Sequence, residues 1–263
     1  MGCWIVALIV VVLVATIAVV IGHFVGKAKK TEQALNDLYG EAVAYVPAMD
    51  GSIAPERVEA FIRVRQRVFE HCSEFQEQWH KVFYPENLEQ GEDTTKSTAV
   101  REGPGGLKQV LKLGPALLRF VDTRNRALLK EEMGLGEYQY IYFMAYIEQL
   151  RRVDDTKFAG FDDAYPGSRA RSEMAQILEN QLDELMSAKN RTADTSLASG
   201  LRSEIAALSA PSSDGHPLPW EDGLPPAIAA SLEPYAEALA QYYCEGIAKI
   251  ELMQKNKGFN FSN

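Results

Sequence analysis

The chain of 263 residues carries 27 basic and 36 acidic side chains, a formal net charge of −9, and only three cysteines. The first 30 positions hold three lysines and no acidic residue, so the rest of the chain is more acidic still. This balance excludes general nucleic-acid binding, which needs a basic face that displaces counterions. Three cysteines are also too few for a disulfide-rich scaffold.

The N-terminus is the most distinctive segment. Residues 3–25 form a run of 23 residues without a charged side chain. A membrane-spanning helix needs roughly 20 apolar residues. The apolar region of a cleaved signal peptide is usually about 7–15 residues long and follows basic residues, and neither condition holds here. We therefore expect an uncleaved transmembrane anchor within residues 1–30, with a cleaved signal peptide and a buried core helix as the alternatives.

The charges beside this run bear on its orientation. Lys27, Lys29 and Lys30 follow it directly, and nothing basic except the α-amine precedes it. The positive-inside rule then favours a cytoplasmic location for the C-terminal part. An N-terminal anchor before a large domain is, however, also a common arrangement for export. Both orientations stay open.

The remaining chain repeats apolar residues at helical spacing, without runs that alternate with period two. We expect helices over residues 31–46, 55–83, 103–133, 137–152, 169–189, 195–208 and 226–256, with Gly114-Pro115 kinking or splitting the third. The predicted fold class is all-α, with an N-terminal transmembrane helix followed by a bundle of about five to seven helices.

A segment rich in proline, glycine and serine divides this bundle from the end of the chain. The bundle is expected over residues 31–208, the linker over 209–226 and a long C-terminal helix within 227–263. A lone amphipathic helix cannot bury its own apolar face, so we expect the last helix to pack back onto the bundle.

Residue types suited to catalysis or metal binding do not converge. Glu77 and His80 form one E-x-x-H step, but a di-iron site in a helical bundle uses that step twice, and no other histidine supplies it. Glu77 and His80 are therefore only a weak metal-site candidate. The chain has no phosphate-binding loop and no G-x-S-x-G nucleophile elbow. We predict no catalytic residues and no cofactor.

Two cysteines fall on apolar helical stripes. Cys72 lies between Phe69 and Phe75 on the stripe of helix 55–83, and Cys244 lies beside the seam of the last helix. Both are expected as small core residues, and a disulfide between them would require an exported domain. The sequence does not decide whether they pair.

A tyrosine-rich helix is the most unusual local feature. Tyr138, Tyr142 and Tyr146 are four residues apart and share one face, and the other sides are apolar as well. This helix, expected over 137–150, should lie at the centre of the bundle. Its tyrosines either line a ligand-binding pocket or belong to a filled core.

Arg65 interrupts the apolar stripe of helix 55–83 and is the fourth candidate ligand-binding residue. If it is buried, it needs a carboxylate partner, for which Asp122 and Glu148 are the candidates. The simpler expectation is that the side chain extends to the rim of the bundle.

The segment 45–68, which follows the apolar N-terminus, carries a D-G-x-[IL]-x-x-x-[QR]-[VM]-x-x-[FY] step before an amphipathic helix. The step is formed by Asp50, Gly51, Ile53, Arg57, Val58 and Phe61. In this it resembles uncharacterised bacterial single-span membrane-anchored helical proteins. The resemblance covers about a tenth of the chain and implies no activity. Members of that group often carry basic residues before the span, which this chain lacks.

Together these features predict a non-enzymatic, membrane-anchored helical domain for protein interaction or scaffolding in the bacterial envelope. The alternatives are a bundle that binds a small molecule or lipid at the tyrosine-rich helix, and an unrecognised metal-dependent or hydrolytic enzyme. The expected location is the bacterial cytoplasmic (inner) membrane, crossed once. The expected partners are the membrane, through residues 3–25, and another protein.

Overall fold

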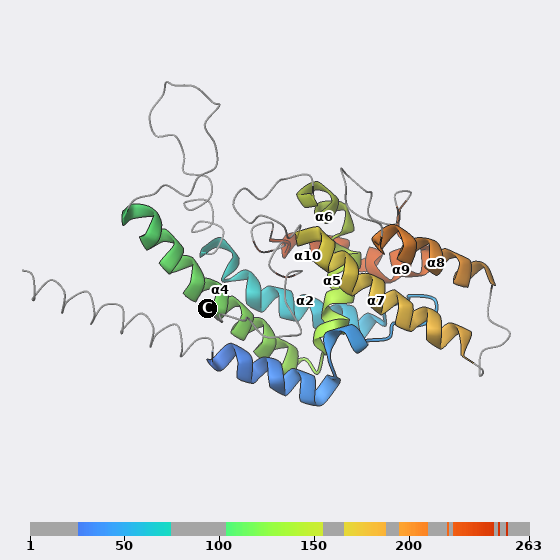
Figure 1. Ribbon diagram of the computed structural model, residues 1–263, viewed down its shortest axis with the longest axis horizontal. Coiled ribbons are helices and arrows are strands. Elements are labelled where there is room, and N and C mark those ends of the chain that lie inside the picture. The colour runs from blue at the N-terminus through green and yellow to red at the C-terminus, as the bar shows by residue number, and fades with distance from the viewer. Residues whose placement is uncertain are drawn as a thin grey trace, which may run out of the picture.

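A computed structural model gives the fold of the chain (Figure 1). It describes residues 26–74, 104–154, 166–187, 195–209, 220, 223–244, 247 and 251. The predicted membrane span at 3–25 lies outside these residues, as do Glu77 and His80.

The described chain is all-α. After a helix at 26–39, the elements are η1 (Ala42–Ala44), α2 (Pro55–Phe69), α4 (Pro104–Lys130), α5 (Leu135–Ala145), α6 (Ile147–Asp154), α7 (Pro166–Met186), α8 (Thr195–Ser209), α9 (Pro226–Leu232), η3 (Glu233–Tyr235) and α10 (Ala236–Gln241). No strand occurs within these described residues, which agrees with the predicted fold class. Across the same residues, no helix is both long and apolar enough to cross a bilayer.

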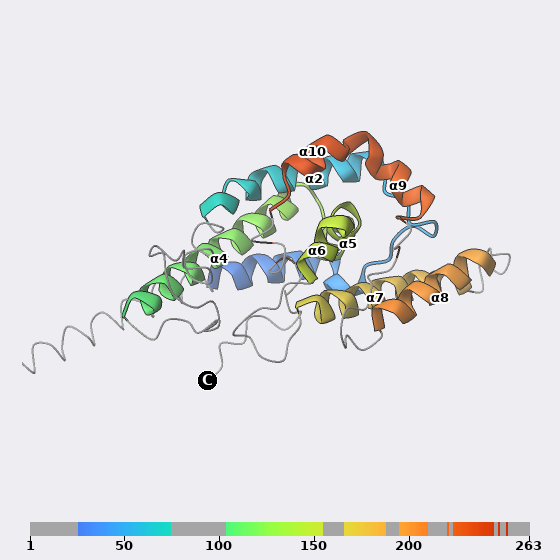
Figure 2. The same cartoon turned by 90° about the horizontal axis from the view of Figure 1, so that it is seen from above.

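Helix α5 organises the bundle. Figures 1 and 2 show it between the layer of α2 and α4 and the antiparallel pair α7 and α8, while α9 and α10 run along α2. Nine of its eleven residues are buried, which confirms the expectation of a central helix. A helix that is apolar on all sides has to be covered on all sides, and this requirement explains the arrangement of its neighbours.

Close backbone contact fixes the start of α5. A Cβ atom at Gly136 would lie 2.1 Å from the carbonyl oxygen of Ala42 and 2.6 Å from the Cβ of Tyr45. Only glycine therefore lets η1 and the residue after it approach this helix. From the other side, Arg57 of α2 donates two hydrogen bonds of 2.6 Å to the carboxylate of Glu137. The N-terminus of α5 is thus held by both neighbours.

The split of the third predicted helix, one of the two outcomes expected at Gly114-Pro115, does not occur in α4. Residues 104–130 form one helix, so Pro115 does not divide it. Proline removes one hydrogen bond and clashes with the preceding turn, at a cost of about 3 kcal/mol. Burial of Ala116, Leu118 and Phe120 just after Pro115 offsets this cost, because the helix must continue to place these side chains in the core.

The long helix expected over 226–256 is broken, and that part of the prediction is wrong. The chain forms α9, η3 and α10 in turn, and Tyr243 and Cys244 are not helical. Pro234 explains the first break, since it lacks a backbone N–H and its ring crowds the preceding turn, while Glu233 before it keeps the α conformation (φ −51°, ψ −46°). The segment nevertheless packs on the bundle, with Ile228, Leu232 and Leu239 in the main core.

Two other predicted helices are interrupted within the described residues. Helix 137–152 divides at Tyr146 into α5 and α6, and Tyr146 adopts φ −119° and ψ 19°. The helix expected over 55–83 ends as α2 at Phe69, followed by a turn at 70–71 and helical residues 72–74. By contrast, α7 and α8 lie close to their predicted bounds.

Candidate functional site

The tyrosines of α5 point to two different environments. Tyr138, Tyr142 and Tyr146 face α2, whereas Tyr140 lies about 200° around the helix from Tyr138 and faces the Asp50–Gly51 turn. All four side chains are buried. The same residue type therefore meets different neighbours on the two sides of α5.

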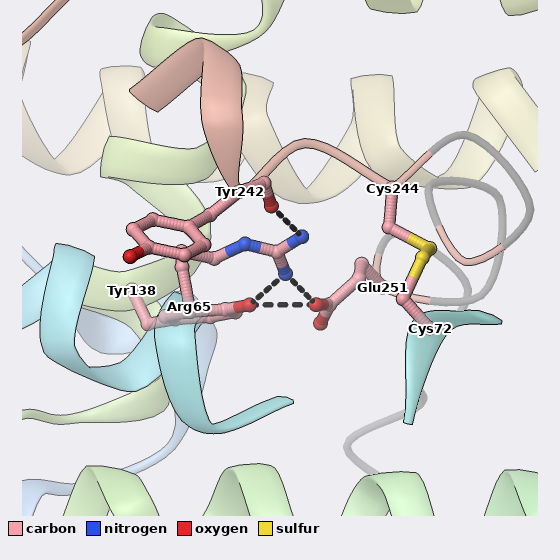
Figure 3. Close-up of a disulfide and its surroundings, with 6 residues drawn as sticks. All are labelled: Arg65, Cys72, Tyr138, Tyr242, Cys244 and Glu251. Atoms are coloured by element: carbon pink, nitrogen blue, oxygen red, sulfur yellow. Dashed lines mark hydrogen bonds and ion pairs between the residues drawn. A yellow bond between two sulfur atoms is a disulfide. The ribbon is translucent and has the colours of Figure 1, made fainter. Parts of the chain in front are cut away.

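The first side holds a buried charge cluster, here defined as Arg65, Arg124 and Glu251 (Figure 3 shows Arg65 and Glu251). None of the three is more than 1% exposed. The carboxylate of Glu251 accepts a bond of 2.5 Å from Nη1 of Arg65 and one of 2.9 Å from Nη1 of Arg124. One carboxylate therefore compensates two guanidinium groups, each supplied by a different helix.

Tyrosine side chains complete this cluster. The hydroxyl of Tyr138 donates to Glu251 at 2.6 Å and accepts from Arg65 at 2.9 Å. Burial raises the pKa of Tyr138 well above its ordinary value of 10, so the phenol keeps the proton that it donates. The guanidinium carbon of Arg65 also lies 5.0 Å from the ring centre of Tyr142 and 5.7 Å from that of Tyr146.

The expectation that Arg65 extends to the rim is therefore wrong. Neither predicted partner is used: Asp122 binds Arg126 at 2.8 Å, and Glu251 takes the place assigned to Asp122 or Glu148. Arg65 is retained inside because its charge is paired and its Nη2 also donates to the carbonyl oxygen of Tyr242.

A disulfide lies beside the charge cluster. Cys72, just after α2, bonds to Cys244, just after α10, with Cα atoms 6.1 Å apart (Figure 3). Both cysteines belong to a smaller hydrophobic cluster with Ala28, Phe120 and Ile247. The bond fixes the segment that carries Glu251 against α2 and α4.

The second side of α5 borders a pocket. Its volume is about 440 Å³, and its walls come from α5, α7, α8, α9 and the turn at residues 50–51. Its lining is largely apolar, including Leu178, Leu201 and Ile228, with the polar groups of Asp50, Tyr140 and Glu204 among them. A volume of roughly 300–1,000 Å³ with a few convergent polar groups is typical of small-molecule sites.

Glu204 and Trp220 form the polar edge of this pocket. The indole N–H of Trp220 donates to Oε1 of Glu204 at 2.5 Å. Burial raises the pKa of the Glu204 carboxyl, and this hydrogen bond partly opposes the rise. Trp220 adopts φ +65°, which a side chain of its size rarely tolerates. Such strain persists only where the surroundings enforce it, here through Glu204 and an edge contact with Phe143.

Tyr140 and the turn at Gly51 form the opposite edge. The Tyr140 hydroxyl donates to the carbonyl oxygen of Gly51 at 3.0 Å. Gly51 has φ +75°, and a Cβ atom there would lie 3.0 Å from Ile228 and 3.1 Å from the Tyr140 oxygen. Asp50 remains ionised beside it, since the hydroxyl and amide of Ser52 donate to its carboxylate and lower its pKa.

No family model, curated protein or solved structure matches the chain. The geometry of the two sides of α5 is therefore the basis for a functional proposal.

The four residues predicted as a ligand site are brought together, but around the charge cluster. Arg65, Tyr138, Tyr142 and Tyr146 contact one another, and Glu251 occupies the position that a bound carboxylate would take. The pocket adjoins the same helix on its other side, at Tyr140.

Sequence reasoning missed Arg124, Glu251 and the pocket residues Glu204 and Trp220. Arg124 carried a usable signal, because it lies three residues after Val121 and four before Leu128 and so interrupts the apolar stripe of its helix, as Arg65 interrupts its own. The pocket has no such signal, since its walls are contributed by segments far apart in the chain. In the described residues, no group of three or more histidine, cysteine or acidic side chains could hold a metal ion.

Proposed function

We propose that this chain is a membrane-anchored, non-enzymatic helical domain that binds a small organic ligand in the pocket beside Tyr140. The observation that carries the proposal is the contrast between the two sides of α5: one side holds the buried charge cluster, and the other borders about 440 Å³ of apolar-walled space. The strained Trp220 supports it further, because backbone strain is concentrated where a ligand is held.

The start of the described chain supports the anchored arrangement. Ala28, Thr31 and Leu35 of helix 26–39 are already buried in the bundle, while Lys27, Lys29 and Lys30 are exposed. If residues 3–25 span the membrane, the domain sits at its surface without an intervening linker. The exposed lysines would then lie at the level of the lipid headgroups.

The Cys72–Cys244 disulfide supports a location of the domain outside the cytoplasm. Disulfides persist in oxidising compartments and are rare in the cytosol. This argument opposes the charge rule at Lys27–Lys30. Topology reporters fused after Asn263 decide between them, since the proposal requires the extracytoplasmic reporter to be active and the cytoplasmic one to be silent.

Ligand binding is tested by filling the pocket. Gly200 of α8 lines it, and a Cβ atom there meets nothing within 4 Å, so Gly200→Leu adds bulk at the pocket without a clash at its Cβ. The full chain in phosphatidylcholine nanodiscs is screened against water-soluble aromatic fragments by ligand-observed NMR. Fragments that bind the wild type are expected to lose at least about tenfold in affinity on Gly200→Leu.

Ser199→Leu is the matched control, because it places the same side chain on the exposed neighbouring position of α8, which does not line the pocket. It should leave fragment binding unchanged. Absence of any binding fragment, or equal binding by the wild type and Gly200→Leu, would overturn the proposal.

Protein interaction is a second candidate function, favoured by exposed apolar side chains in one segment. Leu38, Tyr39, Val46 and Met49 are each at least 40% exposed, between the end of helix 26–39 and the Asp50–Gly51 turn. Concentrated exposed apolar surface marks interaction sites. A photo-crosslinking residue at Leu38 should give a discrete product in cells, whereas one at the separate exposed position Met186 should not.

A further inference from the structure

We infer that the pocket ligand is an organic cation: a protonated or quaternary amine attached to an apolar body. This inference rests on the proposed function and adds the chemical class of the ligand. The charges and aromatic rings that line the pocket carry it.

The charged side chains in the described lining of the pocket are acidic. Asp50 and Glu204 are both part of its lining, and none of its described lining residues is lysine, arginine or histidine. Both carboxylates are close enough to Tyr140 to raise the pKa of its hydroxyl, which burial already raises strongly. A cation placed between the two edges would therefore interact with two negative charges at once.

The second carboxylate oxygen of Glu204, Oε2, is available to bind that cation. Its Oε1 accepts the hydrogen bond from Trp220, and no other described residue bonds to this side chain. Elsewhere in the described chain, two other carboxylates that are largely buried have basic partners: Glu251 binds two arginines and Glu137 binds Arg57. Glu204 is half-buried with a neutral donor only, so its charge is the one that a ligand would compensate.

Aromatic rings stand beside the two carboxylates. Tyr140 and Trp220 are both part of the lining, and the ring of Trp is the strongest cation–π acceptor among side chains. Carboxylates and aromatic rings together, over an apolar floor, match an ammonium group that carries hydrocarbon. A bare metal ion is a poorer match, because hard cations take six or more oxygen ligands and leave no use for the apolar walls.

The experiment uses three probes of similar size and different charge: benzyltrimethylammonium, benzyl alcohol and phenylmethanesulfonate. Each is titrated into the full chain in phosphatidylcholine nanodiscs by isothermal calorimetry, with empty nanodiscs subtracted. The cation is expected to bind at least about tenfold more tightly than the alcohol, and the sulfonate should not bind measurably.

Glu204→Gln then isolates the charge. The amide oxygen can still accept the hydrogen bond from Trp220, so the pocket keeps its shape. The affinity for the cation should fall about tenfold, while the affinity for the alcohol should not change. Glu237→Gln, at an exposed position of α10, is the matched control and should have no effect. Folding of each variant is checked by its unfolding curve.

The outcomes separate the two proposals. Equal binding of cation and alcohol, both lost on Gly200→Leu, would overturn the cation inference and leave the binding pocket intact. Stronger binding of the sulfonate would overturn it as well. Binding of none of the probes would overturn the cation inference, and the fragment screen would then decide the proposed function independently.

Discussion

A buried tyrosine lies on each of the two sides of α5, but the two tyrosines have different neighbours. On one side, Tyr138 is part of a closed network in which two arginines share Glu251. On the other, Tyr140 borders an open pocket with Glu204 and its single neutral donor. The comparison teaches that a tyrosine-rich helix does not by itself indicate a binding face. What distinguishes the sides is whether the protein supplies the counter-charge.

Among the predicted changes, the largest loss in the free energy of unfolding should follow from disrupting the charge cluster. Glu251→Gln leaves Arg65 and Arg124 buried without a counter-charge, so we expect a loss of about 3–5 kcal/mol in the free energy of unfolding. Glu74→Gln is the control, since Glu74 pairs with Arg119 at the surface, and it should cost less than about 1 kcal/mol. If urea unfolding gave the same small loss for Glu251→Gln and Glu74→Gln, the charge cluster would not stabilise the core.

The disulfide is expected to contribute next. Replacing Cys72 and Cys244 together by serine opens a loop of 172 residues and should cost about 2–5 kcal/mol. The same loss should follow reduction of the wild type, and the serine variant should not respond to the reductant. A wild type that is insensitive to reductant would contradict this prediction.

The tyrosines themselves allow a direct comparison of the two sides. Tyr138→Phe removes a bond to a charged group and should cost about 1.5–3 kcal/mol, whereas Tyr140→Phe removes a neutral bond to Gly51 and should cost about 0.5–1.5 kcal/mol. The Tyr142 hydroxyl is buried without a partner among the described residues, so Tyr142→Phe should be neutral or stabilising. Chemical unfolding of the three variants side by side measures this order, and a reversed order would contradict it.

The smallest effect concerns pH and Glu204. Because the folded protein raises the pKa of this carboxyl above its ordinary value of 4.5, its contribution to stability is fully present below that value and is lost as the pH rises through the raised pKa. Glu204→Gln should therefore be slightly more stable than the wild type at pH 7, and the difference should shrink as the pH falls through the raised pKa and vanish below 4.5. A difference that does not depend on pH would show that the carboxyl is not perturbed.

Sequence reasoning reached the class of the fold and the central place of α5, because amphipathic and all-apolar helices have distinct patterns. It found the N-terminus of α2 at Pro55, where proline suits the first helical turn. It did not find the partner of Arg65, since the two residues are 186 positions apart and pairing at that range is decided by the tertiary packing. It also did not find the pocket, because a pocket depends on what the walls leave unfilled.

The separation between Arg65 and Glu251 also has a consequence for how the protein is made. Synthesis delivers α2, α4 and α5 before the C-terminal segment, so Arg65 and Arg124 lack the counter-ion Glu251 until residue 251 has emerged. Contacts this distant in sequence are slow to form, and an incomplete core exposes apolar surface meanwhile. The described bundle should therefore reach its native state only after residue 251 has left the ribosome, so its helices do not complete their packing one by one as they are synthesised.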